Sequence, residues 1–300
     1  MSQIDRIVNA SISRRNFLGL FGASALTVAL AGCGSSNPSS ATTDAATTGD
    51  VTKVIVGTEG TYAPYSYLDD SNNLTGFDVE VARAIGEKLD GYELDFQTIE
   101  WSSMFASLDA GKIQTISNQV AANDERKQKY LFTDTPYSYS VSAVAYKKGR
   151  TDLKTIDDLQ GKTVDGGTTT NYTTWVENYN AEHGNTITIN YTDGDISKML
   201  QDVVNGRVDA TVNSPVTIKK VADEQGIDID WFIVPEAGVV PIYFPFANTD
   251  EGSKLRDAFE TAIQELIADG TISGLSEKFL GADYSTEDAV NKLADEQSQN

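Results

Sequence analysis

Residues 104–118 read MFASLDAGKIQTISN, and residues 199–213 read MLQDVVNGRVDATVN. The two segments align without gaps at an offset of 95 residues, and each reads as helix, glycine, basic residue, strand and asparagine. Gly111 and Gly206 suit the position after a helix where the backbone angle φ is positive, and the basic residue that follows complements the negative end of the helix dipole. Two explanations are open: the chain contains two comparable lobes, or two ordinary helix-to-strand turns look alike.

Strand and helix patterns alternate along most of the chain. Short β-rich runs lie at residues 53–56, 113–116, 162–164 and 208–212, and helical patterns lie at residues 79–89, 103–110, 196–205 and 255–268. This alternation predicts an α/β fold class with largely parallel sheets. If the repeat is real, each lobe ends a strand at an asparagine, Asn118 or Asn213. Because open α/β sheets bind ligands outside the carboxyl ends of their strands, two such edges facing each other would form a cleft.

Composition excludes several classes of function. The 300 residues suffice for about two domains, and 40% of them are hydrophobic, so the chain can bury a core. With 23 basic and 44 acidic residues, the net charge of -21 leaves no broad basic surface, and we expect no nucleic-acid partner. The one cysteine and the one histidine, Cys33 and His183, cannot form an internal disulfide or a histidine-cysteine zinc site. We expect neither a metal nor a cofactor.

Residues 1–32 predict an export signal. Basic residues precede an apolar stretch at residues 17–31 (FLGLFGASALTVALA), which is shorter than the roughly 20 residues that span a bilayer. Residues 13–18 (SRRNFL) resemble a twin-arginine signal, although a general secretory signal can also carry two arginines. Residues 30–33 (LAGC) resemble the lipobox of bacterial lipoproteins. Cys33 is therefore the expected lipid attachment point, the alternative being a chance cysteine beside a small-residue cleavage site.

The segments that flank the body are polar. Removal of residues 1–32 leaves 20 basic and 43 acidic residues, a net charge of -23, so the body would not adhere to anionic lipid by itself. A lipid tether would hold it at the outer face of the cell membrane. Residues 33–50 are rich in Ser, Thr, Ala and Gly and predict a flexible stalk. Residues 285–300 are expected to form a polar tail that frays, with one helical turn at residues 289–293.

The loop at residues 57–67 (GTEGTYAPYSY) is the first candidate ligand segment, because it follows the opening strand and is rich in aromatic residues. Glu59 offers a carboxylate, and Tyr62 at the tip of the turn offers a ring for stacking. Tyr65 and Tyr67 suit the hydrophobic core equally well.

Two further segments precede predicted helices. In residues 100–103 (EWSS), a serine N-cap would place Trp101 on the connecting loop. In residues 117–127 (SNQVAANDERK), a cap at Asn123 or the following aspartate puts Arg126 in the first helical turn, where free N–H groups favour an anion. Arg126 could then clamp a carboxylate, or it could belong to a solvated charged face.

Residues 165–172 (DGGTTTNY) form the fourth candidate segment. Glycines followed by Thr168, Thr169 and Thr170 resemble a small anion cradle of N–H and hydroxyl donors. The segment lacks the lysine of a P-loop and the spacing of a dinucleotide fingerprint, so nucleotide binding is not predicted.

Residues 53–282 resemble the bacterial extracytoplasmic solute-binding proteins of polar-amino-acid ABC importers, family 3. Five motifs carry the resemblance: GTEGTYAPYSY at 57–67, LTGFDVE at 74–80, residues 101–119, DERK at 124–127 with FTDTPY at 132–137, and ADGT at 268–271. The runs SNQV at 117–120, YLF at 130–132 and Asn171-Tyr172 are similar to the cystine-binding branch in particular.

The resemblance implies a two-lobed periplasmic-binding-protein fold of type II, in which two α/β lobes are joined by two hinge strands and close on the ligand. The hinge strands are expected near residues 142–147 and 239–247. Lobe 1 would comprise residues 51–142 and 248–284, and lobe 2 residues 143–247. We expect a monomer that delivers an amino acid, with cystine favoured, to the permease subunits of an ABC importer.

The resemblance also implies roles for single residues. Arg126 would grip the ligand's α-carboxylate, helped by the backbone of Gln119 and Ala121 and by Thr169. Tyr62 and Trp101 would flank the ligand side chain. The expected nearby polar contacts are Glu59, Asn118, Thr168 and Asn171. Ser214 stands where many relatives carry an acid for the α-ammonium group, which leaves the exact ligand open.

Three alternatives to a cystine receptor remain: another amino-acid ligand, an enzyme on the same scaffold, and a sensor input domain. Within the same class, the ligand could be glutamine, arginine or histidine. An enzyme on the same scaffold, such as a dehydratase, would need a positioned acid or base, and we identify no catalytic residue. A sensor input domain would need a second transmembrane segment and a signalling domain, which the sequence lacks.

Overall fold

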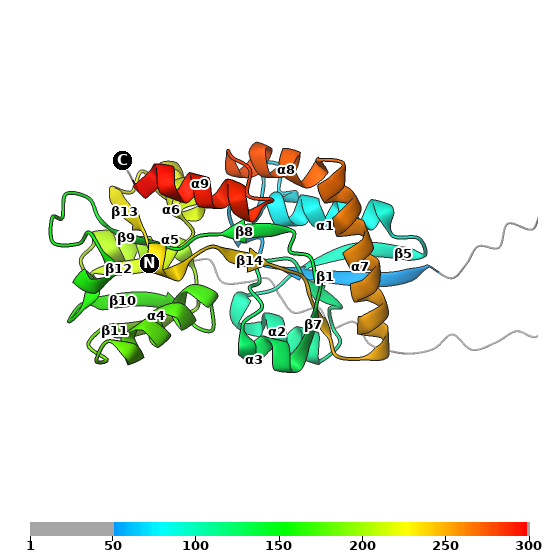
Figure 1. The fold of residues 1–300 in the computed structure, drawn as a ribbon, viewed down its shortest axis with the longest axis horizontal. Helices are drawn as coiled ribbons and strands as arrows, with labels where there is room; N and C mark the ends of the chain where they lie inside the picture. The colour runs from blue at the N-terminus through cyan, green and yellow to red at the C-terminus, as the bar shows by residue number, and fades with distance from the viewer. Residues whose placement is uncertain (1–50, 299–300) are drawn as a thin grey trace, which may run out of the picture. The chain divides into compact units, whose positions relative to one another are not determined.

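The described part of the computed structural model, residues 51–298, forms two α/β lobes (Figure 1). The expected signal peptide (1–32), Cys33 and the stalk (33–50) lie outside the described residues. Between residues 51 and 298, no helix combines the length and the apolar character needed to cross a membrane.

Lobe 1 is built on a five-stranded sheet of order β5-β1-β6-β15-β7, in which β15 alone runs against the other strands. Its strands are β1 (Thr52–Thr58), β5 (Tyr92–Thr98), β6 (Thr115–Ile116), β7 (Tyr130–Phe132) and β15 (Pro245–Ala247). Its helices are α1 (Phe77–Lys88), α2 (Trp101–Asp109), α3 (Asp124–Lys129), α7 (Asp250–Ala268) and α8 (Thr271–Leu280). A small antiparallel sheet holds β2 (Thr61–Tyr62), β3 (Ser66–Leu68) and β4 (Leu74–Thr75).

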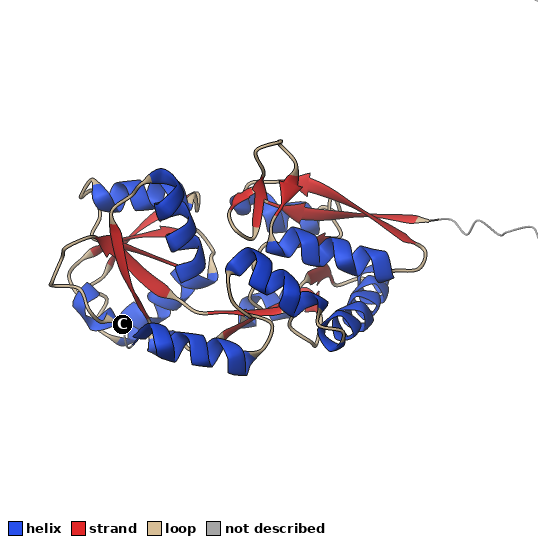
Figure 2. Ribbon diagram, turned by 90° about the horizontal axis from the view of Figure 1, so that it is seen from above, coloured by secondary structure: helices blue, strands red, loops and turns tan. Residues whose placement is uncertain are grey.

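Lobe 2 repeats this plan with a sheet of order β11-β10-β12-β9-β13, in which β9 alone runs against the others. Its strands are β9 (Ala143–Lys147), β10 (Thr163–Gly167), β11 (Thr188–Thr192), β12 (Ala210–Asn213) and β13 (Ile229–Ile233). Its helices are α4 (Asn171–Glu182), α5 (Ile196–Val204) and α6 (Pro215–Gln225), with short 3₁₀ turns η1 (Ile156–Leu159) and η2 (Pro235–Ala237). Helices lie on both sides of each sheet (Figure 2).

The sequence repeat is a structural repeat. Helices α2 and α5 begin and end at positions 95 residues apart, and β6 and β12 both occupy the centre of their sheets. Gly111 and Gly206 have φ of 67° and 71°. In both copies the glycine N–H and the N–H of the basic residue after it bond carbonyls of the last helical turn, which is the Schellman helix end. The prediction of two comparable, largely parallel lobes is therefore confirmed.

Two short antiparallel strands connect the lobes: β8 (Ser138–Ser140) and β14 (Val240–Ile242). β14 lies within the range expected for the second hinge strand. The first expected hinge, residues 142–147, is displaced, because residues 143–147 are β9 of the lobe 2 sheet and β8 precedes them. The return to lobe 1 also comes earlier than expected, since β15 already belongs to the lobe 1 sheet.

The expectation of a frayed tail is wrong. Residues 287–298 form helix α9 (Glu287–Ser298), which packs against β13 of lobe 2 and against β8. Figure 1 shows α9 in red, running from the side of α8 past β8 to β13. The polar composition hides a short apolar stripe, in which Val290 is fully buried and Leu293 packs beside it. An interval of three residues places both side chains on one helix face.

We predict that Val290→Ala lowers the free energy of unfolding by about 2 kcal/mol, because it removes two buried methyl groups and leaves a cavity. Denaturant unfolding measures the change. The matched control is Asn291→Ala, which alters an exposed neighbour in the same helix and should stay within about 0.5 kcal/mol of wild type. Equal effects of the two substitutions would contradict the packing of α9.

Candidate functional site

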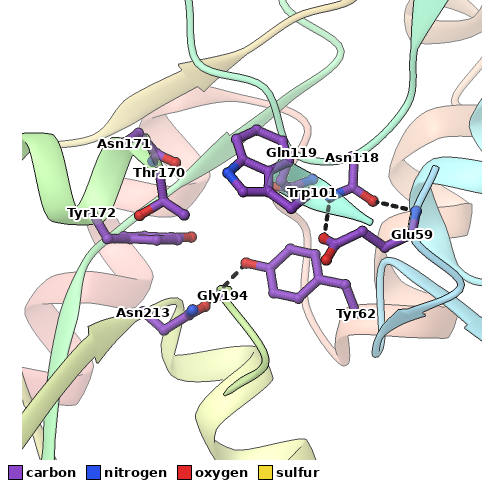
Figure 3. A pocket seen from close by; sticks show the side chains of 10 residues that line it. All are labelled: Glu59, Tyr62, Trp101, Asn118, Gln119, Thr170, Asn171, Tyr172, Gly194 and Asn213. Carbon is purple, nitrogen blue, oxygen red and sulfur yellow. Dashed lines mark hydrogen bonds between the residues drawn. The ribbon is translucent and has the colours of Figure 1, made fainter. Parts of the chain in front are cut away.

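A cavity open to solvent lies between the two lobes (Figure 3), and the space between its walls, open solvent included, is about 380 Å³. Lobe 1 and lobe 2 each contribute five of its lining residues. These are Glu59, Tyr62, Trp101, Asn118 and Gln119 from lobe 1, and Thr170, Asn171, Tyr172, Gly194 and Asn213 from lobe 2. We refer to it as the cavity.

Strand ends supply most of the polar lining groups. Glu59 follows β1 and Asn118 follows β6, while Asn213 is the last residue of β12. Gly194 follows β11, and Asn171 begins the helix after β10. The carboxyl edges of the two sheets therefore face each other across the cavity, as the repeat predicts.

Glu59 and Asn118 form a reciprocal pair on the lobe 1 wall (Figure 3). The Glu59 N–H donates to Asn118 Oδ1 at 3.0 Å, and Asn118 Nδ2 donates to Glu59 Oε2 at 2.6 Å. Burial raises the pKa of Glu59 to about 7, and the hydrogen bond with Asn118 partly opposes this rise. The nearby carboxylates of Glu100, Asp193 and Asp195 raise it further. The cavity thus holds an acid that gains from a positive charge beside it.

Two tyrosines join the lobes at the base of the cavity. Tyr62 Oη donates to Asn213 Oδ1 at 3.0 Å, and Asn213 Oδ1 also accepts the Ser214 N–H. The Tyr65 hydroxyl bonds the Ser214 hydroxyl at 2.9 Å. Ser214 is buried, its hydroxyl bonds Tyr65, and it does not line the cavity.

Trp101 is the first residue of α2, so the expected position on the preceding loop is wrong. The serines do not cap this helix; Glu100 is the N-cap residue and makes no side-chain cap bond. The indole Nε1–H donates to the Thr168 carbonyl of lobe 2 at 3.1 Å. Trp101 also lines a second hollow, together with Arg126, Thr168 and Thr169, whose space is about 1110 Å³ with open solvent included.

Arg126 is a buried cation, only 6% exposed. The expected Asn123 cap is present, because its side chain accepts the Arg126 N–H at 2.9 Å. The guanidinium donates to the Ala121 carbonyl at 2.9 Å and to the Thr169 carbonyl at 2.8 Å, which crosses between lobes. It lies 5.4 Å from the Trp101 ring centre, a cation–π distance.

Burial lowers the pKa of Arg126 to about 10, which leaves the group charged at neutral pH. The two carbonyls use two of the five guanidinium N–H groups. Within residues 51–298, the other three N–H groups have no bonding partner and no carboxylate pairs with the guanidinium. Arg126 therefore retains donors for an anion.

The threonines at residues 168–170 have different roles: some bond the backbone and some line the hollows. Thr170 caps α4 by accepting the Thr173 N–H, which leaves Asn171 as the first residue of that helix. The Thr168 hydroxyl donates to the Thr192 carbonyl. Thr169 has φ of 62°, a left-handed conformation that costs a β-branched residue energy and is frequent at functional sites.

The structure brings six of the predicted residues into the cavity: Glu59, Tyr62, Trp101, Asn118, Gln119 and Asn171. Arg126, Thr168 and Thr169 line the second hollow, while Ala121 and Ser214 line neither. Of the other four lining residues, Thr170 and Tyr172 lie in the candidate segment at residues 165–172 and Asn213 ends a strand at the predicted cleft, whereas Gly194 was missed. The repeat indicated Asn213, which occupies the position of Asn118 in the second copy. Gly194 carries no such signal.

Comparisons with known proteins agree with this geometry. Residues 54–282 match the family model of bacterial extracellular solute-binding proteins, family 3. The "Probable amino-acid-binding protein YxeM" of Bacillus subtilis (strain 168) is 38% identical over 88% of this chain and 94% of that protein. The L-cystine-binding protein TcyJ of the same strain is 35% identical over 77% of this chain and 85% of its own.

Among solved structures, one comes from work on glutathione import in Gram-positive bacteria via GshT and the cystine ABC importer TcyBC of Streptococcus mutans. It is similar to this chain with a TM-score of 0.72 and 27% identity, covering 78% of this chain and 97% of the other.

We predict that the Glu59 carboxyl of the ligand-free protein titrates near pH 7 rather than at its ordinary value of 4.5. A raised folded-state pKa contributes stability that is fully present below pH 4.5 and is lost as the pH rises through 7. Carbon-13 NMR of the carboxyl groups follows the titration, and chemical denaturation follows the stability. Glu59→Gln should remove the resonance and this fall in stability. A midpoint between pH 4 and 5 would show that burial does not control this group.

Proposed function

Because the chain belongs to family 3 of the bacterial extracellular solute-binding proteins, we propose that it is a lipid-anchored receptor that captures cystine for an ABC importer. Its place as the amino-acid-binding component of such an importer follows from the family and its relatives. The choice of cystine, the lipid anchor and the roles of single residues are the proposal.

One observation carries the proposal: an acid and an unpaired cation lie at hollows that share Trp101. Glu59 lines the cavity, and Arg126 lines the second hollow. A zwitterion would satisfy both groups, with a carboxylate at Arg126 and an ammonium at Glu59. A charge-assisted bond of this kind is about twice as strong as a neutral one, and burial at both ends strengthens the attraction further.

Cystine fits this arrangement because it is charged at both ends and apolar at its central disulfide. One carboxylate would bind Arg126 beside Thr169 of the other lobe, and the disulfide would lie against Tyr62 and Trp101. The second amino-acid end would meet polar groups of both lobes, namely Asn118, Asn171 and Asn213. The name of the TcyJ relative supports the same ligand.

Ser214 does not supply an acid for the α-ammonium group, and Glu59 takes that role in the proposal. Glu59 is the acid that lines the cavity among the described residues. Binding of an ammonium group favours its ionised form, so the affinity should increase as the pH rises toward 7.

Ligand binding would act by population shift. The contacts at Arg126 and Trp101 already join the lobes through Thr169 and Thr168. A ligand that touches both lobes stabilises the closed form, whereas one that touches a single lobe does not shift the equilibrium. An importer can then distinguish the loaded receptor by its shape.

We predict that cystine raises the melting temperature. At a ligand concentration of 100 Kd, binding adds about 2.7 kcal/mol of stability, which corresponds to roughly 5–10 °C for a protein of this size. Thermal unfolding and calorimetry with cystine, cysteine, glutamine, arginine, histidine and glutathione measure the preference. We expect cystine to bind most tightly and cysteine weakly.

Arg126→Ala should lower the cystine affinity at least about 30-fold, because truncating one partner of a desolvated charge pair costs about 2–5 kcal/mol. Lys127→Ala in the same helix is the control, since Lys127 is exposed and lines neither hollow. If another amino acid or glutathione binds strongly and cystine does not, the ligand assignment is wrong and the receptor class stands.

We also predict that the mature protein begins at a lipidated Cys33. The intact mass of membrane-derived protein should show the lipid, and the protein should partition into detergent. Cys33→Ala should release it into the aqueous phase. A mature form cut at another residue, without lipid, would contradict the anchor.

A further inference from the structure

Asp78 is a fully buried acid that the proposed ligand contacts do not use. It is the second residue of α1, and its N–H donates to the Tyr65 carbonyl at 3.0 Å. Burial raises its pKa to about 7, and the groups that oppose this rise are the amides of Gln119 and the Tyr137 hydroxyl rather than a basic residue. Burying a carboxylate without a cation beside it costs free energy. We therefore ask which group the Asp78 carboxylate holds in place through its hydrogen bonds.

Both oxygens of Asp78 bond the same residue. Oδ2 accepts the Gln119 backbone N–H at 2.7 Å, and Oδ1 accepts Gln119 Nε2 at 2.8 Å. Gln119 has φ of 51°, in the left-handed region that glycine favours. A residue in this region persists only when its surroundings enforce it. The two bonds to Asp78 hold both the backbone and the side chain of Gln119 in place.

The turn at Gln119 directs the chain to the site. Gln119 lines the cavity, and the next carbonyl, that of Val120, accepts the Tyr243 N–H beside the hinge at 2.9 Å. Ala121 then forms a bridge with Ile242 of β14. The Ala121 carbonyl is the one that receives the Arg126 guanidinium. The conformation of Gln119 therefore sets the cavity wall, the hinge contact and one partner of Arg126.

We propose that Asp78 is a positioning residue of the ligand site, which clamps Gln119 through its backbone and side-chain amides and so aligns residues 119–121 with Arg126 and β14. Asp78 itself does not line the cavity. For its binding readout this inference rests on the proposed function, and a second readout in the ligand-free protein keeps the two separable.

Exchanging the hydrogen-bond donors and acceptors of residues 78 and 119 tests whether Asp78 holds Gln119 in place. In Asp78→Asn the new amide group faces Gln119 Nε2, donor against donor, so we expect the ligand affinity to fall tenfold or more. Residues that support the ligands of metal sites typically contribute 10–100-fold in affinity, and we expect an effect of similar size here. In the double variant Asp78→Asn/Gln119→Glu, the Asn Oδ1 accepts the residue 119 N–H and the Asn Nδ2 donates to the Glu carboxylate. Both bonds return, so the affinity should rise above that of Asp78→Asn; because residue 119 lines the cavity, Gln119→Glu alone is measured beside it.

The binding readout is the Kd of the tightest amino acid in the panel, measured by calorimetry with the melting temperature recorded for each variant. Asp90→Asn, an exposed acid just after α1, is the matched control. If Asp78→Asn does not fold, Gln119→Ala, which retains the backbone bond, takes its place and should also weaken binding at least threefold. The second readout is hydrogen exchange of the Gln119 amide in ligand-free protein, which should accelerate at least tenfold in Asp78→Asn and slow again in the double variant.

The outcomes separate the two proposals. If the wild type binds none of the amino acids, the proposed function fails while the exchange data still test the clamp. Restoration of exchange protection and affinity by the double variant supports the clamp. If the single variants bind within threefold of wild type, or the double variant is no better than the weaker single variant, the positioning role of Asp78 is overturned.

Discussion

Strands β9 and β15 enter their sheets directly from the hinge, and this direction of entry fixes where the residues that line the cavity lie. β9 begins at Ala143, which pairs with Asn213 at the end of β12. Phe246 of β15 likewise pairs with Thr115 of β6. Because every other strand of each sheet runs against the entering strand, the carboxyl ends of those strands point back toward the hinge. Two crossings thus place Glu59, Asn118, Asn171 and Asn213 opposite one another, although they are far apart in the chain.

The charges at the cavity and the second hollow favour the zwitterionic ligand that we propose. The net charge of the chain is -21, and among residues 51–298 the buried cation beside the cleft is Arg126. Carbonyl oxygens and aromatic rings offset part of the cost of that burial, but none of them carries a full negative charge. Glu59 presents the opposite case, an acid whose raised pKa reflects burial among other acids. Arg126 lacks a negative partner and Glu59 lacks a positive one, so a zwitterion would supply both partners. A neutral ligand of the same size would supply neither.

The repeat made the fold predictable, because Met104, Gly111 and Asn118 recur as Met199, Gly206 and Asn213 and both copies fold alike. Local rules were less reliable at ends of elements. A serine cap predicted Trp101 on a loop, yet the indole packs and bonds across the cleft, and this tertiary contact coincides with an earlier helix start. Six candidate residues line the cavity because strand ends and aromatic loops are visible in sequence. The position of Gly194 and the bonds of Asp78 depend on packing between distant segments, which one sequence does not reveal.

Helix α9 adds a constraint on motion that two hinge strands alone would not give. A pair of hydrogen-bonded strands is a ribbon, which bends readily across its face and also twists along its length. After α8 the chain leaves lobe 1, passes β8 and docks α9 on β13 of lobe 2. This third passage is a further connection between the lobes beside the ribbon, and the packing of α9 against β8 and β13 opposes motions that would separate them. Because a third connection limits how the lobes can separate, fewer open arrangements are accessible, and a ligand that draws the lobes together would forfeit less conformational entropy.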